Sequence, residues 1–409
     1  MPHGYGTLVA ELRDALTRQR YNRVAVHNYC RNANHFLAYL AARNIALEAV
    51  TPIDVTNYLR FAVRQFRKRH ARAPARYWTG IPRSGIHALL KLALKRWPPE
   101  PAAAPDELIC REACDQYRTW LREERGLATA SVDALLWEAR NFCAWLIKHS
   151  NATSFADLTV HDVDIYMDMR APGLARKSLK DVAERLRSLL KHLHRTGRTA
   201  ADLSQHVIAP LLYAYEGIPS ALSSDQISIV LKSVRKDRSP MGLRDYAILQ
   251  LLATYGLRSG EISRLRLEDV DWRADILHIR RSKTGDHSLL PLFETVGEAL
   301  IEYLRHGRPE TDVREIFVRT RAPYVPMVRI YNEVSRRIEA AGITLSGKRG
   351  PHIFRHARAV SLLRASVPRK LIGDVLGHRS TESTIPYLKL ATEDLRAIAL
   401  EIPGQEVRS

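Results

Sequence analysis

The chain has 409 residues and a mass of 46.5 kDa, which is more than one hydrophobic core usually serves, so two or three domains are expected. Hydrophobic residues make up 45% and charged residues 26% of the chain, as in water-soluble globular proteins, and no stretch approaches the roughly 18 consecutive apolar residues of a membrane span. Lysine and arginine number 63 against 44 acidic residues, a net charge of +19, which favours a polyanionic partner.

The start of the chain and its cysteines exclude further classes. Residues 1–14 (MPHGYGTLVAELRD) lack the basic-then-apolar pattern of a signal peptide, so we expect the protein in the cytosol. Four cysteines in the whole chain argue against a disulfide scaffold. Cys110 and Cys114 have no matching Cys/His pair nearby, so no zinc site is expected.

The first two hundred residues contain a repeated pattern. Phe36-x-x-Tyr39-Leu40 recurs as Phe142-x-x-Trp145-Leu146, and Thr51-x-x-Asp54-Val55-x-x-Tyr58-Leu59 recurs as Thr159-x-x-Asp162-Val163-x-x-Tyr166-Met167. Apolar residues return every three or four positions in both copies, which is typical of helices, and each threonine stands where a helix N-cap is expected. The pattern therefore predicts two helical domains related by duplication.

Punctuating residues set the expected boundaries. A proline-rich run at 98–105 separates the two copies, and Gly217-Ile218-Pro219-Ser220 follows the second. We expect helical domains at 1–100 and 105–216, a third domain at 220–393 and a tail at 394–409. Residues 1–100 carry 17 Lys/Arg against 5 Asp/Glu, which favours contact between this first domain and a long anionic duplex.

The third part has a mixed pattern. Residues 243–255 are strongly apolar and predict a helix. Residues 276–281 and 289–292 read as two short strands around a Lys283-Thr284-Gly285-Asp286 turn, because glycine and aspartate supply turn chemistry. Helices are expected from there to the end.

Polar residues recur at short spacings in this last part. Arg258 follows the helix stop Gly256, and Glu261 stands one helical turn on, where it can orient the guanidinium. His352 and Arg355 share a helix face, followed by His356. Leu376-Gly377-His378 comes next, with the histidine nine residues before Tyr387. His192/Arg195 and His278/Arg281 have the same His-x-x-Arg spacing and are interpreted as chance matches.

Taken in order, Gly-Leu-Arg258-x-x-Glu261, the hairpin with Lys283, His352-x-x-Arg355-His356, Leu-Gly-His378 and Tyr387 resemble the tyrosine recombinases, the phage-integrase and transposon-recombinase family. The resemblance covers roughly residues 222–393. It implies a mainly α fold with a helical domain of the SAM-like, core-binding type at 105–216. The repeat adds a second such helical domain at 1–100, which goes beyond the minimal two-domain pattern of the family. A C-terminal mixed α/β catalytic domain with a small antiparallel sheet follows them.

The resemblance also implies roles for these residues. Tyr387 is the expected nucleophile on a DNA phosphodiester, Arg258 and Arg355 clamp the phosphate, His352 and His378 complete its pocket, and Lys283 is the general acid, with Glu261 and His356 in support. Planar guanidiniums suit the charge that develops on phosphate oxygens, so neither a metal nor another cofactor is expected. A phosphotyrosine linkage preserves the bond energy, so rejoining needs no ATP.

The predicted protein is thus a site-specific DNA recombinase, an integrase or transposase of a mobile element, acting on nucleoid DNA in the cytoplasm. The family implies a tetramer on two duplexes, joined by amphipathic tails such as residues 395–403. Pro386 directly precedes the expected nucleophile, where it fixes one backbone dihedral and removes an N–H. This proline is a departure from what the resemblance leads us to expect.

Three alternatives stay open at this point. A type IB topoisomerase shares the chemistry but acts as a monomer without site specificity. A non-catalytic family member would keep the scaffold and bind DNA only. A helical adaptor for acidic proteins would explain the charge of the chain and nothing else.

Overall fold

The computed structural model describes residues 5–99, 105–149, 154–212, 221–281, 287–345, 347 and 349–377. This part of the chain is mainly helical and contains a three-stranded antiparallel sheet in its C-terminal region, as the sequence predicts. None of its helices is long and apolar enough to cross a membrane. Backbone contacts group the chain into two compact units, one of residues up to Pro99 and from Gly217 onward, the other of Glu100–Glu216.

The N-terminal segment is a small helical bundle around its own apolar core. Phe36, Leu40, Ile86 and Leu89 are fully buried there. Its elements are α1 (Tyr5–Arg18), α2 (Arg23–Ala41), η1 (Leu47–Ala49), α3 (Pro52–His70) and α4 (Gly80–Leu94).

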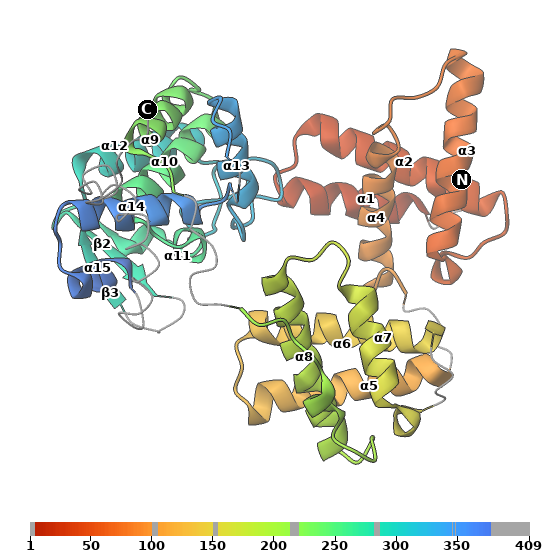
Figure 1. Ribbon diagram of the computed structural model, residues 1–409. Coiled ribbons are helices and arrows are strands. Elements are labelled where there is room, and N and C mark those ends of the chain that lie inside the picture. The colour runs from red at the N-terminus through yellow and green to blue at the C-terminus, as the bar shows by residue number, and fades with distance from the viewer. Residues whose placement is uncertain are drawn as a thin grey trace, which may run out of the picture. The chain divides into compact units, whose positions relative to one another are not determined.

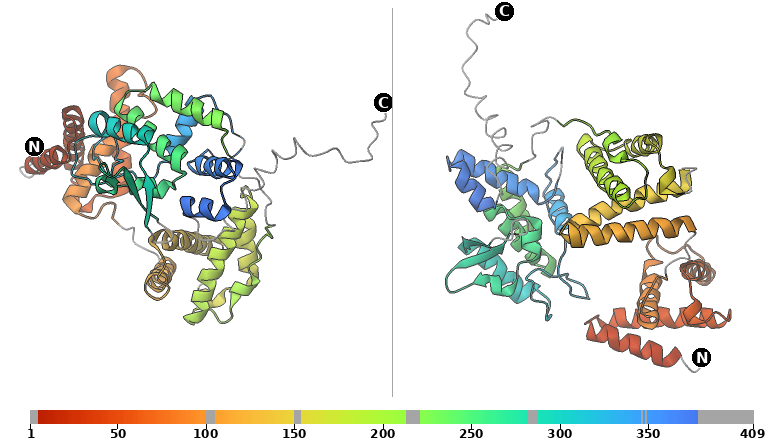
Figure 2. Two further views of the ribbon diagram at one scale, coloured as in Figure 1. Left: turned by 90° about the vertical axis from the view of Figure 1, so that its left-hand side faces the viewer. Right: turned by 90° about the horizontal axis from the view of Figure 1, so that it is seen from below.

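The second helical segment has the same order of elements, two long helices, a short 3₁₀ turn and two more helices. Figure 2 shows α5 and α6 running alongside each other in this segment. Its elements are α5 (Pro105–Thr119), a π-helical turn η2 (Trp120–Glu124), α6 (Thr129–His149), η3 (Phe155–Asp157), α7 (Val160–Arg170), α8 (Arg176–Arg195) and η4 (Leu203–His206).

The repeated threonines cap corresponding helices in the two segments. The Thr51 backbone N–H donates to Asp54 Oδ2 at 2.9 Å at the start of α3, and the Thr159 N–H donates to Asp162 Oδ2 at 2.9 Å at the start of α7. Each threonine hydroxyl in turn accepts from the aspartate N–H at 3.4 Å. Both N-cap predictions are confirmed, and each cap satisfies helix N–H groups that would otherwise lack partners.

The repeated aromatic residues also occupy corresponding places. Tyr58 on α3 meets Phe36 edge-on at 5.2 Å between ring centroids, and Tyr166 on α7 meets Phe142 in the same way at 5.0 Å. An aromatic pair of this geometry adds to the hydrophobic contribution of each core. The same contact therefore fixes the angle between the second and third helices of both segments.

The C-terminal region is built around α10. This helix is buried on nearly all sides and contacts α9, α12, α13 and α14 (Figure 1). The helices of this region are α9 (Ser224–Arg235), α10 (Pro240–Tyr255), α11 (Ser259–Ser263), η5 (Leu267–Asp269), α12 (Glu294–Glu302), the π-helical turn η6 (Tyr303–Gly307), α13 (Tyr331–Ala340), α14 (His352–Arg364) and α15 (Arg369–Leu376).

The sheet has the order β1-β2-β3 and is antiparallel throughout, with β1 at Val270–Asp271, β2 at Ile276–Arg280 and β3 at His287–Pro291. The predicted strand ends are corrected: β2 stops one residue earlier than expected and β3 begins two residues earlier, because its pairing with β2 runs from Ile276↔Pro291 to Arg280↔His287. β1 was not expected, since two residues are too few to show an alternating pattern.

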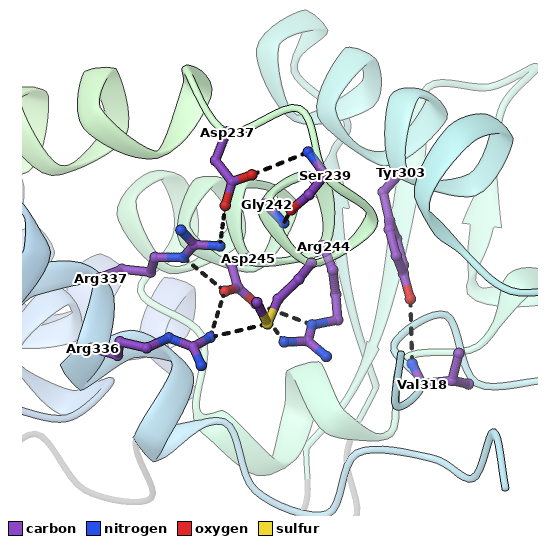
Figure 3. A network of polar contacts seen from close by, with 10 residues as sticks. Asp237, Ser239, Gly242, Arg244, Asp245, Tyr303, Val318, Arg336 and Arg337 are labelled. Atoms are coloured by element: carbon purple, nitrogen blue, oxygen red, sulfur yellow. Dashed lines mark hydrogen bonds and ion pairs between the residues drawn. The ribbon is translucent and has the colours of Figure 1, made fainter. Parts of the chain in front are cut away.

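A buried carboxylate joins α10 to α13. Asp245 is 1% exposed. Its Oδ1 accepts from Arg244 Nη2 at 2.7 Å, and its Oδ2 accepts from Arg337 Nε at 2.8 Å and from Arg336 Nη2 at 3.1 Å (Figure 3). Arg337 Nη2 also pairs with Asp237 Oδ2 at 2.8 Å. One buried anion thus binds guanidiniums from two helices, α10 and α13.

Replacing this carboxylate tests its weight in the fold. Asp245→Ala leaves a buried arginine without its anion, so we expect a loss of about 3–5 kcal/mol in the free energy of unfolding. The measurement is chemical denaturation followed by circular dichroism. Glu302→Gln is the control, because its pair with Arg238 is exposed and should change stability by less than about 1 kcal/mol. Equal effects of the two substitutions would contradict the proposed role of Asp245.

Candidate active site

Arg258 is placed by a sharp reversal of the chain after α10. Gly256 caps α10 in the left-handed conformation, with φ of 65°, and Arg258 is already the N-cap of α11. A Cβ at Gly256 would lie 2.9 Å from Leu376 Cδ2. The position therefore needs glycine both for its backbone angle and for the close approach of α15.

Glu261 orients Arg258, as the sequence predicts. Glu261 Oε1 accepts from Arg258 Nη1 at 2.9 Å, and Oε2 accepts from the Arg258 backbone N–H at 2.9 Å. The Glu261 side chain is fully buried. A buried carboxylate must be paired, so the bond from Nη1 holds the guanidinium in one place while the backbone bond caps the start of α11.

Arg355 lies on α14 and reaches the same place from another direction. It is 3% exposed. Its Nη1 donates to the Gly256 carbonyl oxygen at 2.9 Å and its Nη2 to the Leu376 carbonyl oxygen at 2.5 Å. Arg258 Nη2 donates to the carbonyl oxygen of the next residue, Gly377, at 2.6 Å. The two arginines, far apart in sequence, therefore meet at the C-terminal end of α15.

The end of α15 suits these cations. The last carbonyls of a helix lack partners within the helix and carry partial negative charge. Gly377 closes α15 in the left-handed conformation, with φ of 65°. The guanidiniums supply the hydrogen bonds that the open carbonyls need, and they gather positive charge where the described chain stops.

A third arginine belongs to this cluster. Arg281, just after β2, is 2% exposed. Its Nη1 donates to Glu261 Oε2 at 3.3 Å, its Nη2 to the Val375 carbonyl oxygen at 2.8 Å, and its Nε to Ser288 Oγ at 2.9 Å. Reading His278/Arg281 as a chance match was thus wrong for the arginine. The available signal was strand alternation, since Leu277, Ile279 and Arg281 share the buried phase of β2.

Burial also affects the titration of Arg281. Removal from water lowers the pKa of its guanidinium, and the charge of the nearby Arg258 lowers this pKa further. The Glu261 carboxylate acts in the opposite direction and raises it. An arginine titrates so far above neutral pH that it keeps its charge here. The single negative charge of Glu261 is shared between the guanidiniums of Arg258 and Arg281, so a net positive charge stays in the site.

The two histidines of α14 are one turn apart. His352, the first residue of α14, is exposed, and His356 is half-buried. Their ring centroids are 6.2 Å apart and the rings are nearly parallel. His352 and Arg355 do share the start of one helix, as predicted. His192 and Arg195, the other chance match, lie instead beside Trp120 in the second helical segment.

Three predicted site residues lie outside the described residues: Lys283, His378 and Tyr387. The same holds for Pro386 and for the tail at 394–409. The described part of the site therefore consists of the arginine cluster, Glu261 and the α14 histidines. The β2–β3 hairpin is tied to it because Tyr255 Oη, at the end of α10, donates to the Pro291 carbonyl oxygen at 2.7 Å.

Comparison with known families and proteins shows what this chain is similar to. Residues 220–394 match the model of the phage integrase family. A Sinorhizobium fredii protein named as integrase/recombinase y4gC is 64% identical over 190 residues, which is 46% of this chain and 99% of the relative. A second protein of that organism, integrase/recombinase y4rA, is 34% identical over 292 residues, 71% of this chain and 70% of the relative.

The chain belongs to the phage integrase family. It is a site-specific tyrosine recombinase that cleaves and rejoins DNA. Its fold is also similar to that of the XerH site-specific recombinase solved in complex with its palindromic difH substrate. That likeness has a TM-score of 0.54 and 16% identity, over 77% of this chain and 88% of the other.

A variant of Arg281 and a matched control test whether this residue positions the arginine cluster of the recombinase. Arg281→Met removes the charge that joins Glu261, β3 and α15, so the arginine cluster should shift and strand cleavage should slow at least tenfold, with DNA affinity within about twofold. Arg280→Gln is the control, because its pair with Asp269 is half exposed. Cleavage rate and DNA affinity are measured separately. Equal cleavage rates in the two variants would exclude a positioning role for Arg281.

Gly377 offers a second test of the same contact. A Cβ there would lie 2.7 Å from Arg281 Nε, whereas a Cβ at Gly342 would meet nothing within 4 Å. Both glycines have positive φ, 65° and 76°, so both alanine variants carry a similar backbone cost of about 1–2 kcal/mol. Gly377→Ala should lower the cleavage rate and the unfolding midpoint further than Gly342→Ala. A larger effect at Gly342 would contradict the close packing at Gly377.

Proposed function

We propose that Tyr387 is the nucleophile of this recombinase and that Arg258 and Arg355 bind the scissile phosphate. The observation that carries this is the meeting of the two guanidiniums at the carbonyls of Leu376 and Gly377, directly before His378 in the sequence. Two planar, permanently charged groups in one place match the oxygens of an attacked phosphodiester.

The proposed step forms one bond and breaks another. The Tyr387 oxygen attacks phosphorus, the bond to the 5′ oxygen breaks, and a 3′-phosphotyrosine remains. A tyrosine side chain ordinarily has a pKa of about 10, so its proton needs an acceptor in this step, and we assign that role to the histidines, His378 and His352. Lys283 gives a proton to the departing 5′ oxygen, and His356 supports His352 from the next turn of α14.

Rejoining is the reverse of this step. A 5′-hydroxyl attacks the phosphotyrosine and releases Tyr387, so no ATP is consumed. When the 5′-hydroxyl belongs to another duplex, the product is recombinant. The arginine cluster supplies the positive charge for both directions, so the proposed chemistry proceeds without a metal ion.

The domain arrangement belongs to the same proposal. Separate apolar cores in residues 5–97, 110–207 and 222–357 support two helical DNA-binding domains, at 1–100 and 105–216, before a catalytic domain at 220–393. The matching caps and aromatic pairs of the two helical segments support their origin by duplication. We further propose a homotetramer on two duplexes at the nucleoid, with the tail at 394–409 docking on a neighbouring subunit.

A covalent-adduct assay tests the nucleophile. The protein is incubated, with EDTA present, with DNA from the ends of its element that carries a nick just beyond the cleavage point, so that the short end diffuses away and rejoining fails. We expect an SDS-resistant protein–DNA band that Tyr387→Phe abolishes. Tyr331→Phe is the control, since this tyrosine is an exposed residue of α13.

The outcomes of this assay separate the alternatives. An adduct that survives in Tyr387→Phe would refute the assigned nucleophile. No adduct on DNA that the protein binds would favour a non-catalytic DNA-binding protein. Relaxation of a supercoiled plasmid without any recombination site would instead favour topoisomerase-like activity.

A further inference from the structure

One difference between the two helical segments is a cavity. In the N-terminal segment a cavity of about 710 Å³ opens between α2, α3 and the start of α4. Ligand sites in proteins are commonly of this size. None of the residues that line the cavity is acidic.

The second segment fills the corresponding place with a polar network. Tyr166 Oη donates to Glu138 Oε1 at 2.5 Å, and Arg170 Nη2 donates to Glu138 Oε2 at 3.1 Å. The Arg170 guanidinium also lies 5.2 Å from the ring centre of Trp137. Glu138 is 1% exposed, so the network closes the gap between α6 and α7 with a satisfied carboxylate.

The N-terminal segment lacks the two charged members of this network. In the register of the repeat, Asn32 stands at the position of Glu138, Tyr58 at that of Tyr166 and Ala62 at that of Arg170. All three line the cavity. The Asn32 side chain donates to the Asn28 carbonyl oxygen of its own helix at 2.8 Å. The exchange removes a carboxylate and a long side chain from this place, and Tyr58 keeps its buried packing against Phe36 and Tyr39.

The inner surface of the cavity is aromatic. The Arg43 guanidinium carbon lies 3.9 Å from the ring centre of Tyr39 and 5.6 Å from that of Phe61. Phe66 and Trp78, both half-buried, are 5.0 Å apart between ring centroids. Such rings present faces on which a planar group can stack, and Arg43 already occupies one face in this way.

The mouth of the cavity is basic. Arg31 on α2 and Arg69 on α3 both line it and are exposed. Burial lowers the pKa of His35 between them, and the charges of Arg31 and Arg69 lower it further. Both guanidiniums and His35 line the same cavity, so an anion at its mouth would meet positive charge from two helices.

We propose that this cavity binds an unpaired nucleotide of a DNA strand, with the base stacked among the aromatic rings and the phosphate at Arg31 and Arg69. The reasoning rests on the chain acting on DNA and goes beyond the proposed chemistry of Tyr387. A base in a duplex is stacked on both faces, so it cannot enter a cavity of this kind unless the strand is open. Stacking on aromatic residues beside a basic groove is how proteins hold single strands without reading their sequence.

The second segment supplies the design for a test variant. Asn32→Glu/Ala62→Arg rebuilds the Glu138–Tyr166–Arg170 network in the N-terminal segment and fills the cavity without changing the net charge. Ala10→Glu/Asn57→Arg is the matched control, because it introduces the same two side chains at exposed positions of α1 and α3. Arg43→Gln is a third variant that leaves the cavity open and removes one stacking cation.

The probes are fluorescent (dT)10 and a ten-base-pair duplex without a recombination site, measured by anisotropy on the full chain at one salt concentration. We expect the filled variant to lose at least tenfold in affinity for (dT)10 with its duplex affinity unchanged, Arg43→Gln to lose about threefold or more, and the control to lose nothing. Circular dichroism establishes that each variant is folded.

Three results would overturn the proposal. The first is an unchanged affinity of the filled variant for (dT)10, and the second is an equal loss of affinity for (dT)10 and for the duplex. The third is competition by dTMP at the concentration at which unlabelled (dT)10 competes, which would make the ligand a free nucleotide. Binding is measured without cleavage, so failure here leaves the covalent-adduct assay intact, and failure of that assay leaves this one intact.

Discussion

The buried carboxylate of Glu261 is the interaction on which the active site depends. Three guanidiniums gathered in a space of low polarity would repel one another, and burying any of them alone is costly. Glu261 accepts from Arg258 and Arg281 at once, and the open carbonyls at the end of α15 accept from all three arginines. Positive charge is thereby assembled before any DNA is present, and under the proposed phosphate-binding role this lowers the reorganisation that the reaction requires.

The same contacts link elements that are distant in sequence. Arg281 joins the β2–β3 hairpin to α11 and α15, and Arg355 joins α14 to the turn after α10. Displacement of α15 would therefore move Arg258 and Arg355, the two arginines of the proposed phosphate site, together. Because His378 and Tyr387 follow α15 in the chain, the geometry at Gly377 sets where the segment that bears the proposed nucleophile begins.

Local spacing explains which parts of the site could be predicted. Arg258 and Glu261 are one helical turn apart, and His352 and Arg355 share a helix face, so short motifs reveal them. Arg281 could not be found in this way, because its partners come from α11, β3 and α15. Its place in the buried phase of a strand was the available signal, but a strand of five residues gives little alternation to read. The repeated helix caps were easier to predict from the sequence, because Thr51 and Thr159 contact an aspartate only three residues further along the chain.

The difference between the two helical segments illustrates what a repeat alone does not show. Asn32 and Ala62 look unremarkable in the sequence, and they gain meaning only beside Glu138 and Arg170, whose ion pair fills the same place in the other segment. The buried pair holds α6 and α7 at a fixed distance, yet it also occupies the gap between them. The N-terminal segment keeps its helices together through the Phe36–Tyr58 contact and the rings around Tyr39. Replacing the carboxylate and the arginine together leaves no buried charge unpaired, so the cavity carries no electrostatic cost of that kind.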